Sequence, residues 1–232
     1  MTQASPHVTQ HHSRLIRFLS DLRLAEQDLS YRDFGERLGL LLNFADSILL
    51  ADTLKALPRQ QPVLAEADGS DLKAVFLRTQ ATLVSSVVAS CAGADVSNRL
   101  RWPTLQPGTA PVFDLYQRFY VAHQRELDLG VRALRQQVRD ALRTVSAPLA
   151  QLASLDGVME DVLWDHSRRF FAVIPRFLQQ RFNHLMGESV TAPMLHQFRR
   201  ETQSLLLAEL ETRLQPVMGL IEAFEQEATH HQ

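Results

Sequence analysis

The side chains with the best spacing for metal chemistry are Asp161, Asp165 and His166. Residues four apart share one face of a helix, so the two carboxylates would lie together. His166 instead falls on the apolar stripe of the same segment. A di-metal site in a helical bundle needs glutamates and Glu-x-x-His pairs from several helices, and the sequence does not provide such a set. We therefore interpret His166 as a core or interface histidine and predict no metal and no other cofactor.

Residue types that support covalent or nucleotide chemistry are also poorly placed. Cys91 is the only cysteine and lies in an apolar stretch, which is typical of an inert buried thiol. The sequence contains neither a Gly-x-Ser-x-Gly elbow nor a Gly-rich phosphate loop. We predict that the protein is not an enzyme. An unassigned enzyme with a pocket around His123 or His166 ranks last among the hypotheses.

Arginines give the best nucleic-acid signal. Arg125, Arg132 and Arg139 recur every seven residues and form a basic ridge beside an apolar seam. Acidic residues share the same segment, and the flanks of a coiled coil normally carry such charges for pairing between helices. We favour a salt-bridged flank and keep nucleic-acid binding as the alternative.

Composition limits the remaining classes. The chain has 232 residues, 45% of them hydrophobic, and a net charge of -2. It can therefore bury a substantial core, and it has no overall charge bias toward nucleic acid or an anionic membrane. The N-terminus lacks the apolar core of a secretory signal, and the apolar stretch 38–57 carries polar residues that disfavour a bilayer span. We predict a cytoplasmic protein that contacts a membrane only through a partner.

Hydrophobic periodicity predicts the elements that must position these residues. Three long amphipathic helices are expected over 112–144, 146–186 and from 191 onward, with bends at Pro175 and Pro216. The first carries a continuous apolar seam with steps of three and four residues, which is typical of a helix that packs along a partner helix. The seam consists of Phe113, Tyr116, Tyr120, Leu127, Val131, Leu134, Val138, Leu142 and Val145.

The first half of the chain predicts a polar tail over 1–12 and an N-terminal helical subdomain over 13–92. Its helices are expected over 13–27, 30–57 and, less securely, from Ser70 to Cys91. Prolines and glycines predict a linker over 93–111 before the bundle of 112–232. The predicted fold class is therefore all-α: three long antiparallel helices kinked at prolines, with two or three shorter N-terminal helices. The alternative is that the subdomain and the bundle form one continuous domain.

Several segments resemble a known family. They are Ser13-Arg14-Leu15-Ile16-Arg17-Phe18-Leu19, Phe34-Gly35-Glu36-Arg37-Leu38 with Ala45-Asp46-Ser47-Ile48, and Ala122-His123-Gln124-Arg125 onward to Arg181-Phe182. Together they resemble an uncharacterised proteobacterial family of about this length, known as a domain of unknown function. The resemblance is weakest over 58–111 and in the last helix. It implies genes near motor-type and outer-membrane-protein-A-like envelope proteins, but it carries no functional residues.

The functional prediction is a helical adaptor or scaffold that binds another protein or self-associates. Its partner is expected to be the cytoplasmic part of an envelope complex. Binding would use aromatic and aliphatic anchors on the seam and on the second long helix. These anchors are Tyr116, Leu127, Leu134, Val138, Trp164 and Phe171.

Overall fold

The computed structural model describes residues 14, 15, 48, 51, 52, 55, 69–93, 100–104, 111–187 and 190–230. Their regular structure is entirely helical, which confirms the all-α prediction for the described residues. The helices are α4 (Gly69–Ala92), α5 (Phe113–Val145), α6 (Ala147–Ala172), α7 (Ile174–Met186) and α8 (Ala192–His230). The predicted helices over 13–27 and 30–57 lie outside the described residues, apart from six isolated positions.

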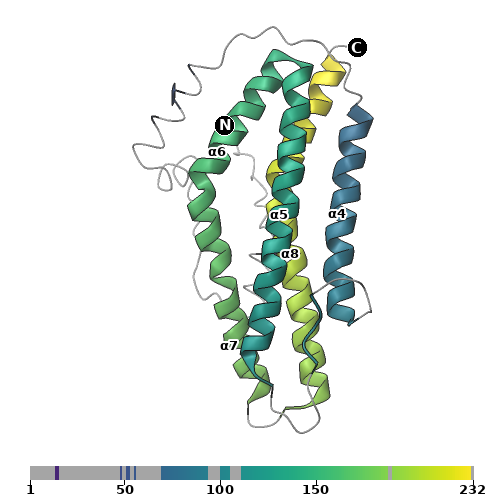
Figure 1. The fold of residues 1–232 in the computed structure, drawn as a ribbon, viewed down its shortest axis with the longest axis vertical. Helices are drawn as coiled ribbons and strands as arrows, with labels where there is room; N and C mark the ends of the chain where they lie inside the picture. Colours follow the sequence, from purple (N-terminus) through teal and green to yellow (C-terminus); the bar gives the residue numbers. More distant parts are fainter. Residues whose placement is uncertain are drawn as a thin grey trace, which may run out of the picture.

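A parallel pair, α5 and α8, forms the centre of the bundle, with α4 on one side and α6 with α7 on the other (Figure 1). Cross-helix contacts establish the directions. Asp128 on α5 pairs with Arg213 on α8, while Tyr120, earlier on α5, bonds to Glu209, earlier on α8. The pairs Arg132–Glu160 and Arg135–Asp156 show that α6 is antiparallel to α5. The contacts Arg181–Glu201 and Phe182–Phe198 show that α7 is antiparallel to α8.

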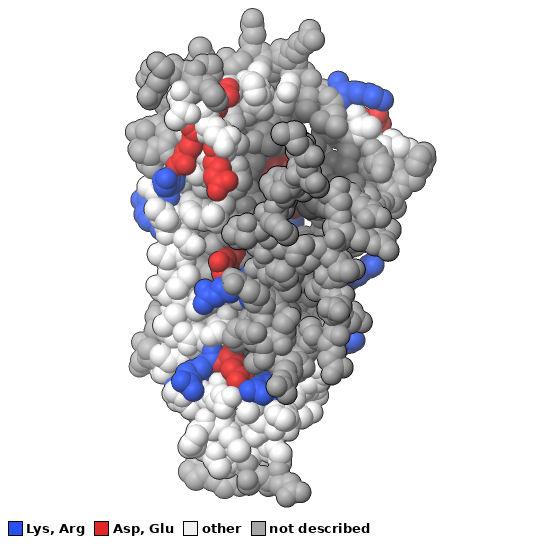
Figure 2. Space-filling view, turned by 180° about the vertical axis from the view of Figure 1, so that it is seen from behind, with Lys and Arg blue, Asp and Glu red and all other residues white. Residues whose placement is uncertain are grey.

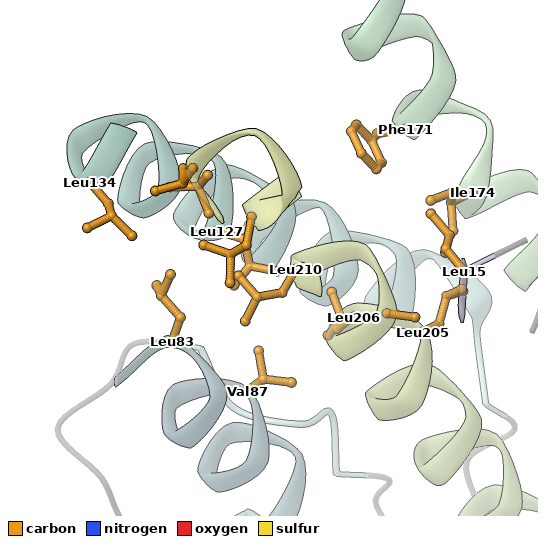
Figure 3. Packing of buried hydrophobic residues seen from close by; sticks show 14 of the residues in the cluster. Leu15, Leu83, Val87, Leu127, Leu134, Phe171, Ile174, Leu205, Leu206 and Leu210 are labelled. Carbon is orange, nitrogen blue, oxygen red and sulfur yellow. The ribbon is translucent and has the colours of Figure 1, made fainter. Parts of the chain in front are cut away.

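The core lies where α4, α5 and α8 meet. Leu83 and Val87 of α4 point toward apolar side chains of α5 and α8 (Figure 3). Leu15 also belongs to this cluster and is fully buried. Because α4 packs directly against both central helices, it is part of the same core as the long helices.

The second predicted long helix is two helices rather than one bent helix. α6 ends at Ala172, Val173 separates the two, and Pro175 occupies the first turn of α7. Proline has no amide hydrogen to donate to the carbonyl four residues earlier, which here belongs to Phe171. α8, in contrast, is a single helix that contains Pro216.

One helix that the structure describes has the length and composition of a membrane span. Residues Leu72–Ala92 of α4 have a mean hydropathy of 1.3, and 28% of the span is buried. One such helix is weak evidence of a membrane span, because a core helix of a soluble protein passes the same test. The apolar stretch considered at 38–57 lies mostly outside the described residues.

Glycine positions in the helices give a prediction on stability. A Cβ at Gly157 would meet no atom within 4 Å, whereas one at Gly130 would lie 2.8 Å from Cδ2 of Leu83. Alanine in a helix is more favourable than glycine by about 0.8–1 kcal/mol. We expect Gly157→Ala to raise the free energy of unfolding by about that amount in urea titrations, and Gly130→Ala to gain less because Leu83 must move. Equal gains at both sites would contradict the close α4–α5 packing.

Candidate functional site on α6

Most of the predicted partner seam lies inside the chain's own core. Tyr116, Leu127, Leu134 and Val138 are each at most 2% exposed. The ring of Tyr116 packs against the rings of Trp102, Phe182 and Phe198, from three other segments. The seam is therefore covered by neighbouring helices and offers no free surface in this arrangement. Trp164 and Phe171 lie elsewhere, on α6.

A buried polar network joins α5 to α8, and we call it the Glu209 network. The Glu209 carboxylate is fully buried. One oxygen accepts hydrogen bonds from Tyr120 Oη and Gln124 Nε2, both at 2.9 Å, and the other accepts from Arg213 Nε and Nη2 at 3.0 and 2.8 Å. Burial, with the nearby carboxylate second, raises the pKa of Tyr120 well above its ordinary value. Arg213 Nη1 also donates to Asp128 at 2.7 Å. Each of the two carboxylate oxygens of Glu209 therefore accepts two hydrogen bonds. Such bonds offset the cost of removing a charged group from water.

The same network compensates for the helix break. Gln124 Nε2 donates to the carbonyl oxygen of Phe171 at 3.1 Å. That carbonyl is the one left without its helical donor by Pro175. A side chain of α5 thus satisfies the end of α6, and it joins the α6–α7 break to the buried carboxylate of Glu209.

A second cluster of ion pairs holds α5 against α6. Arg135 binds Asp156 through two hydrogen bonds of 2.8 and 2.6 Å, and Arg139 bonds to both Asp156 and Glu160. Arg132 lies 3.4 Å from Glu160, and its guanidinium stacks 4.0 Å from the ring centre of Trp164. Paired, planar guanidinium contacts of this kind fix the distance between two helices.

The predicted arginine ridge is therefore not a row of free cations. The side chain of Arg139 is 8% exposed and that of Arg132 is 44% exposed, and both pair with acids on α6. Arg125 is exposed. On the side of the molecule facing away from the viewer in Figure 1, basic and acidic side chains lie beside one another over the described surface (Figure 2). Arg125 is thus the one residue of the ridge left without an acidic contact among the described residues.

A cavity of about 700 Å³ separates α6 from α5 and α8. The buried residues of α6 are Leu149, Ala153 and Phe171, near its two ends. Between them α6 diverges from α5, and the chain returns to the bundle at α7 (Figure 1). Arg213 lies 3.8 Å over the ring of Phe171. With the Arg132–Trp164 stack, this contact places two guanidinium groups between α6 and the central helices.

One protein family matches nearly the whole chain. The sequence model of a family described as "Protein of unknown function (DUF3348)" matches residues 1–226. The chain belongs to this family. The DUF3348 match includes 58–111 and most of the last helix, where the resemblance was weakest. No curated protein and no solved structure matches the chain.

The two histidines considered for catalysis have different surroundings. His166 lines the cavity and His123 is 1% exposed. His123 Nδ1 lies 3.0 Å from the carbonyl oxygen of Phe119, so it carries the proton and donates, while Nε2 has no partner among the described residues. Neither ring bonds to a carboxylate in the part of the chain that the structure describes. Nor do the described residues contain a group of three or more ligands placed for a metal.

No sequence motif marks the residues that organise this site. Glu209, Gln124 and Arg213 are common polar residues on amphipathic helices, so their types alone predict no special role. One signal was available, since Glu209 lies between the apolar residues Leu206 and Leu210 and thus on a predicted buried face.

This DUF3348 protein should lose stability in mild acid because of His123. Burial lowers its pKa below the ordinary 6.5. The unfolded chain then takes up a proton as pH falls below about 6.5 while the folded chain does not, so the free energy of unfolding decreases. We expect His123→Gln to remove on the order of 1 kcal/mol of the loss between pH 7.5 and 5.5. Urea titrations measure it, and exposed His184→Gln is the control that should keep the full loss.

Cys91 should be nearly unreactive in the folded protein. Its side chain is 1% exposed, and burial raises its pKa to about 12. The thiolate is the reactive form. We expect a disulfide reagent at pH 8 to label the native chain roughly a hundredfold or more slower than the urea-unfolded chain. Similar rates in both states would show that the end of α4 opens readily.

Proposed function

We propose that this protein is a non-enzymatic helical adaptor that binds another protein through aromatic side chains of α6. The supporting observation is that large aromatic residues remain at the surface there. Phe170 is 47% exposed, and its ring packs edge-on against Phe171 at 5.2 Å. Trp164 is half-buried and held in place by Arg132.

Residues of these types dominate protein–protein binding energy when they are held rigidly. Tryptophan and arginine are enriched among the anchors of interfaces, and they are most effective when ordered before binding. The stacking of Arg132 on Trp164 and of Phe170 on Phe171 supplies that order. Of the predicted partner residues, the proposal keeps Trp164 and Phe171, while Tyr116, Leu127, Leu134 and Val138 serve the core.

The proposed setting is the cytoplasmic side of a bacterial envelope complex, with membrane contact made by the partner. The resemblance to the family suggests this setting. The long helices, with the break at Val173, would act as a rigid support that displays α6. The nucleic-acid alternative would depend on Arg125 and its exposed neighbour Arg118, because Arg132 and Arg139 are paired with α6.

A comparative capture experiment tests the adaptor. The full chain, its Trp164→Ala/Phe170→Ala variant and a Leu129→Ala control would each be used as bait in lysate from the source cells. Leu129 is a suitable control because it is apolar, 68% exposed and on α5, away from the cavity lining. We expect one stoichiometric protein to be captured by the wild type and the control and lost with the α6 variant. Identical capture by all three baits would exclude this surface.

Light scattering on the eluted protein separates self-association from adaptor function. A monomer that binds a different protein supports the adaptor. A dimer that the α6 variant converts to monomer would mean that α6 binds a second copy, and the adaptor proposal would fail.

A further inference from the structure

We propose that the cavity beneath α6 is a binding site for an uncharged, mostly apolar small molecule. This site shares Trp164, Phe170 and Phe171 with the proposed protein-binding surface, but the inference does not rest on that function. The volume of about 700 Å³ lies within the range of small-molecule pockets. Spaces between the helices of a bundle are common positions for such sites.

The wall formed by α6 is apolar. Leu152, Leu155, Met159 and Leu163 line the cavity, and none of them is fully buried by the rest of the protein. Protein interiors are normally close-packed, so side chains that border a large void lose dispersion contacts. An apolar molecule in the cavity would restore these contacts and remove apolar surface from water.

The charges around the cavity indicate that the molecule is neutral. Arg135, Asp156 and Glu160 line the cavity and are already joined in ion pairs, and so are Asp128 and Arg213. No charge of either sign is left over among them to bind a charged group. Burying an ionic ligand without a partner would cost several kcal/mol, so an ion should bind much more weakly than a neutral molecule of the same shape.

Two polar side chains indicate where a hydrogen-bonding end would lie. His166 and Ser167 both line the cavity, and neither has a hydrogen-bond partner among the described residues. Ser167 and Phe170 are exposed, so they mark the mouth of the cavity. The molecule that fits has an apolar body against Met159 and Leu163 and a hydroxyl, carbonyl or similar group at the mouth.

The positions of the two ends of α6 keep the cavity open. The ends of α6 are tied by the one-residue turn at Ser146 and by the break at Val173. Arg132 stacks on Trp164 between α5 and α6, and Arg213 stacks on Phe171 near the C-terminal end of α6. A site of this kind exists before binding, so little conformational entropy is lost when a ligand enters.

The test uses the neutral fluorophore N-phenyl-1-naphthylamine with the full-length chain. We expect saturable binding of one molecule per chain, and displacement by dodecan-1-ol at a concentration at least about tenfold lower than by dodecanoate or dodecyltrimethylammonium. Met159→Trp, which partly fills the cavity, should weaken binding, while Leu129→Trp on the exposed face of α5 should leave it unchanged. Thermal melts of both variants verify folding, and Leu163→Phe replaces Met159→Trp if that variant does not fold.

Three results would overturn the proposal: no saturable binding, equal displacement by the three amphiphiles, or equal binding by the filled and control variants. Because Met159 is not one of the proposed protein-binding anchors, failure of this test leaves the capture experiment on Trp164 and Phe170 unaffected.

Discussion

Replacing Glu209 with alanine should lower the free energy of unfolding by about 3–5 kcal/mol, the largest single-residue effect that we expect. The Glu209 side chain is fully buried and accepts four hydrogen bonds. Alanine would leave Arg213, 13% exposed, as a buried cation with only Asp128 as a partner, and would leave Tyr120 without its acceptor. Urea unfolding followed by circular dichroism at 222 nm measures the loss.

Glu211 provides a matched control two residues along the same helix. Its side chain is 48% exposed and lies 3.6 Å from Arg14, and exposed pairs of this kind contribute at most about 1 kcal/mol. A double variant, Glu209→Leu with Arg213→Leu, removes both charges and should recover part of the lost stability. If Glu209→Ala costs no more than Glu211→Ala, the buried network does not exist in solution.

The second large effect concerns the coupling between Gln124 and Pro175. Gln124→Leu should cost about 1–3 kcal/mol, because the Phe171 carbonyl loses its donor at 3.1 Å and Glu209 loses one of its own. Pro175→Ala restores a backbone amide four residues after Phe171, which can donate to the same carbonyl. In that background, Gln124→Leu should cost roughly 1 kcal/mol less.

A double-mutant cycle from urea titrations gives this coupling directly. Gln136→Leu serves as the control, since Gln136 bonds to Asp140 and Arg139 on its own helix and has no bond to the α6–α7 break. Its cost should be the same with proline or alanine at position 175. If the cost of Gln124→Leu is also independent of residue 175, the Phe171 carbonyl is satisfied in some other way.

Much of the helical architecture was predictable because its causes are local. The prediction of a helix over 112–144 differs by one residue at each end from α5, Phe113–Val145, and the segment from Ser70 to Cys91 corresponds to α4, Gly69–Ala92. Apolar spacing, the cap at Ser146 and proline in the first turn of α6 act within a few residues. The apolar setting of Cys91 likewise predicted its burial.

Only the tertiary structure decided what covers each apolar or charged face. Periodicity shows that Leu127 and Leu134 need a neighbour, but the same pattern results whether that neighbour belongs to this chain or to another. The partners of Glu209 lie 89 and 85 residues away at Tyr120 and Gln124, and those of Arg139 lie 17 and 21 residues away on α6. Such pairings depend on the register of packed helices, to which no local pattern responds. The sequence therefore determined the helices and their buried faces, whereas packing determined the ion pairs, the satisfied carbonyl at Phe171 and the cavity under α6.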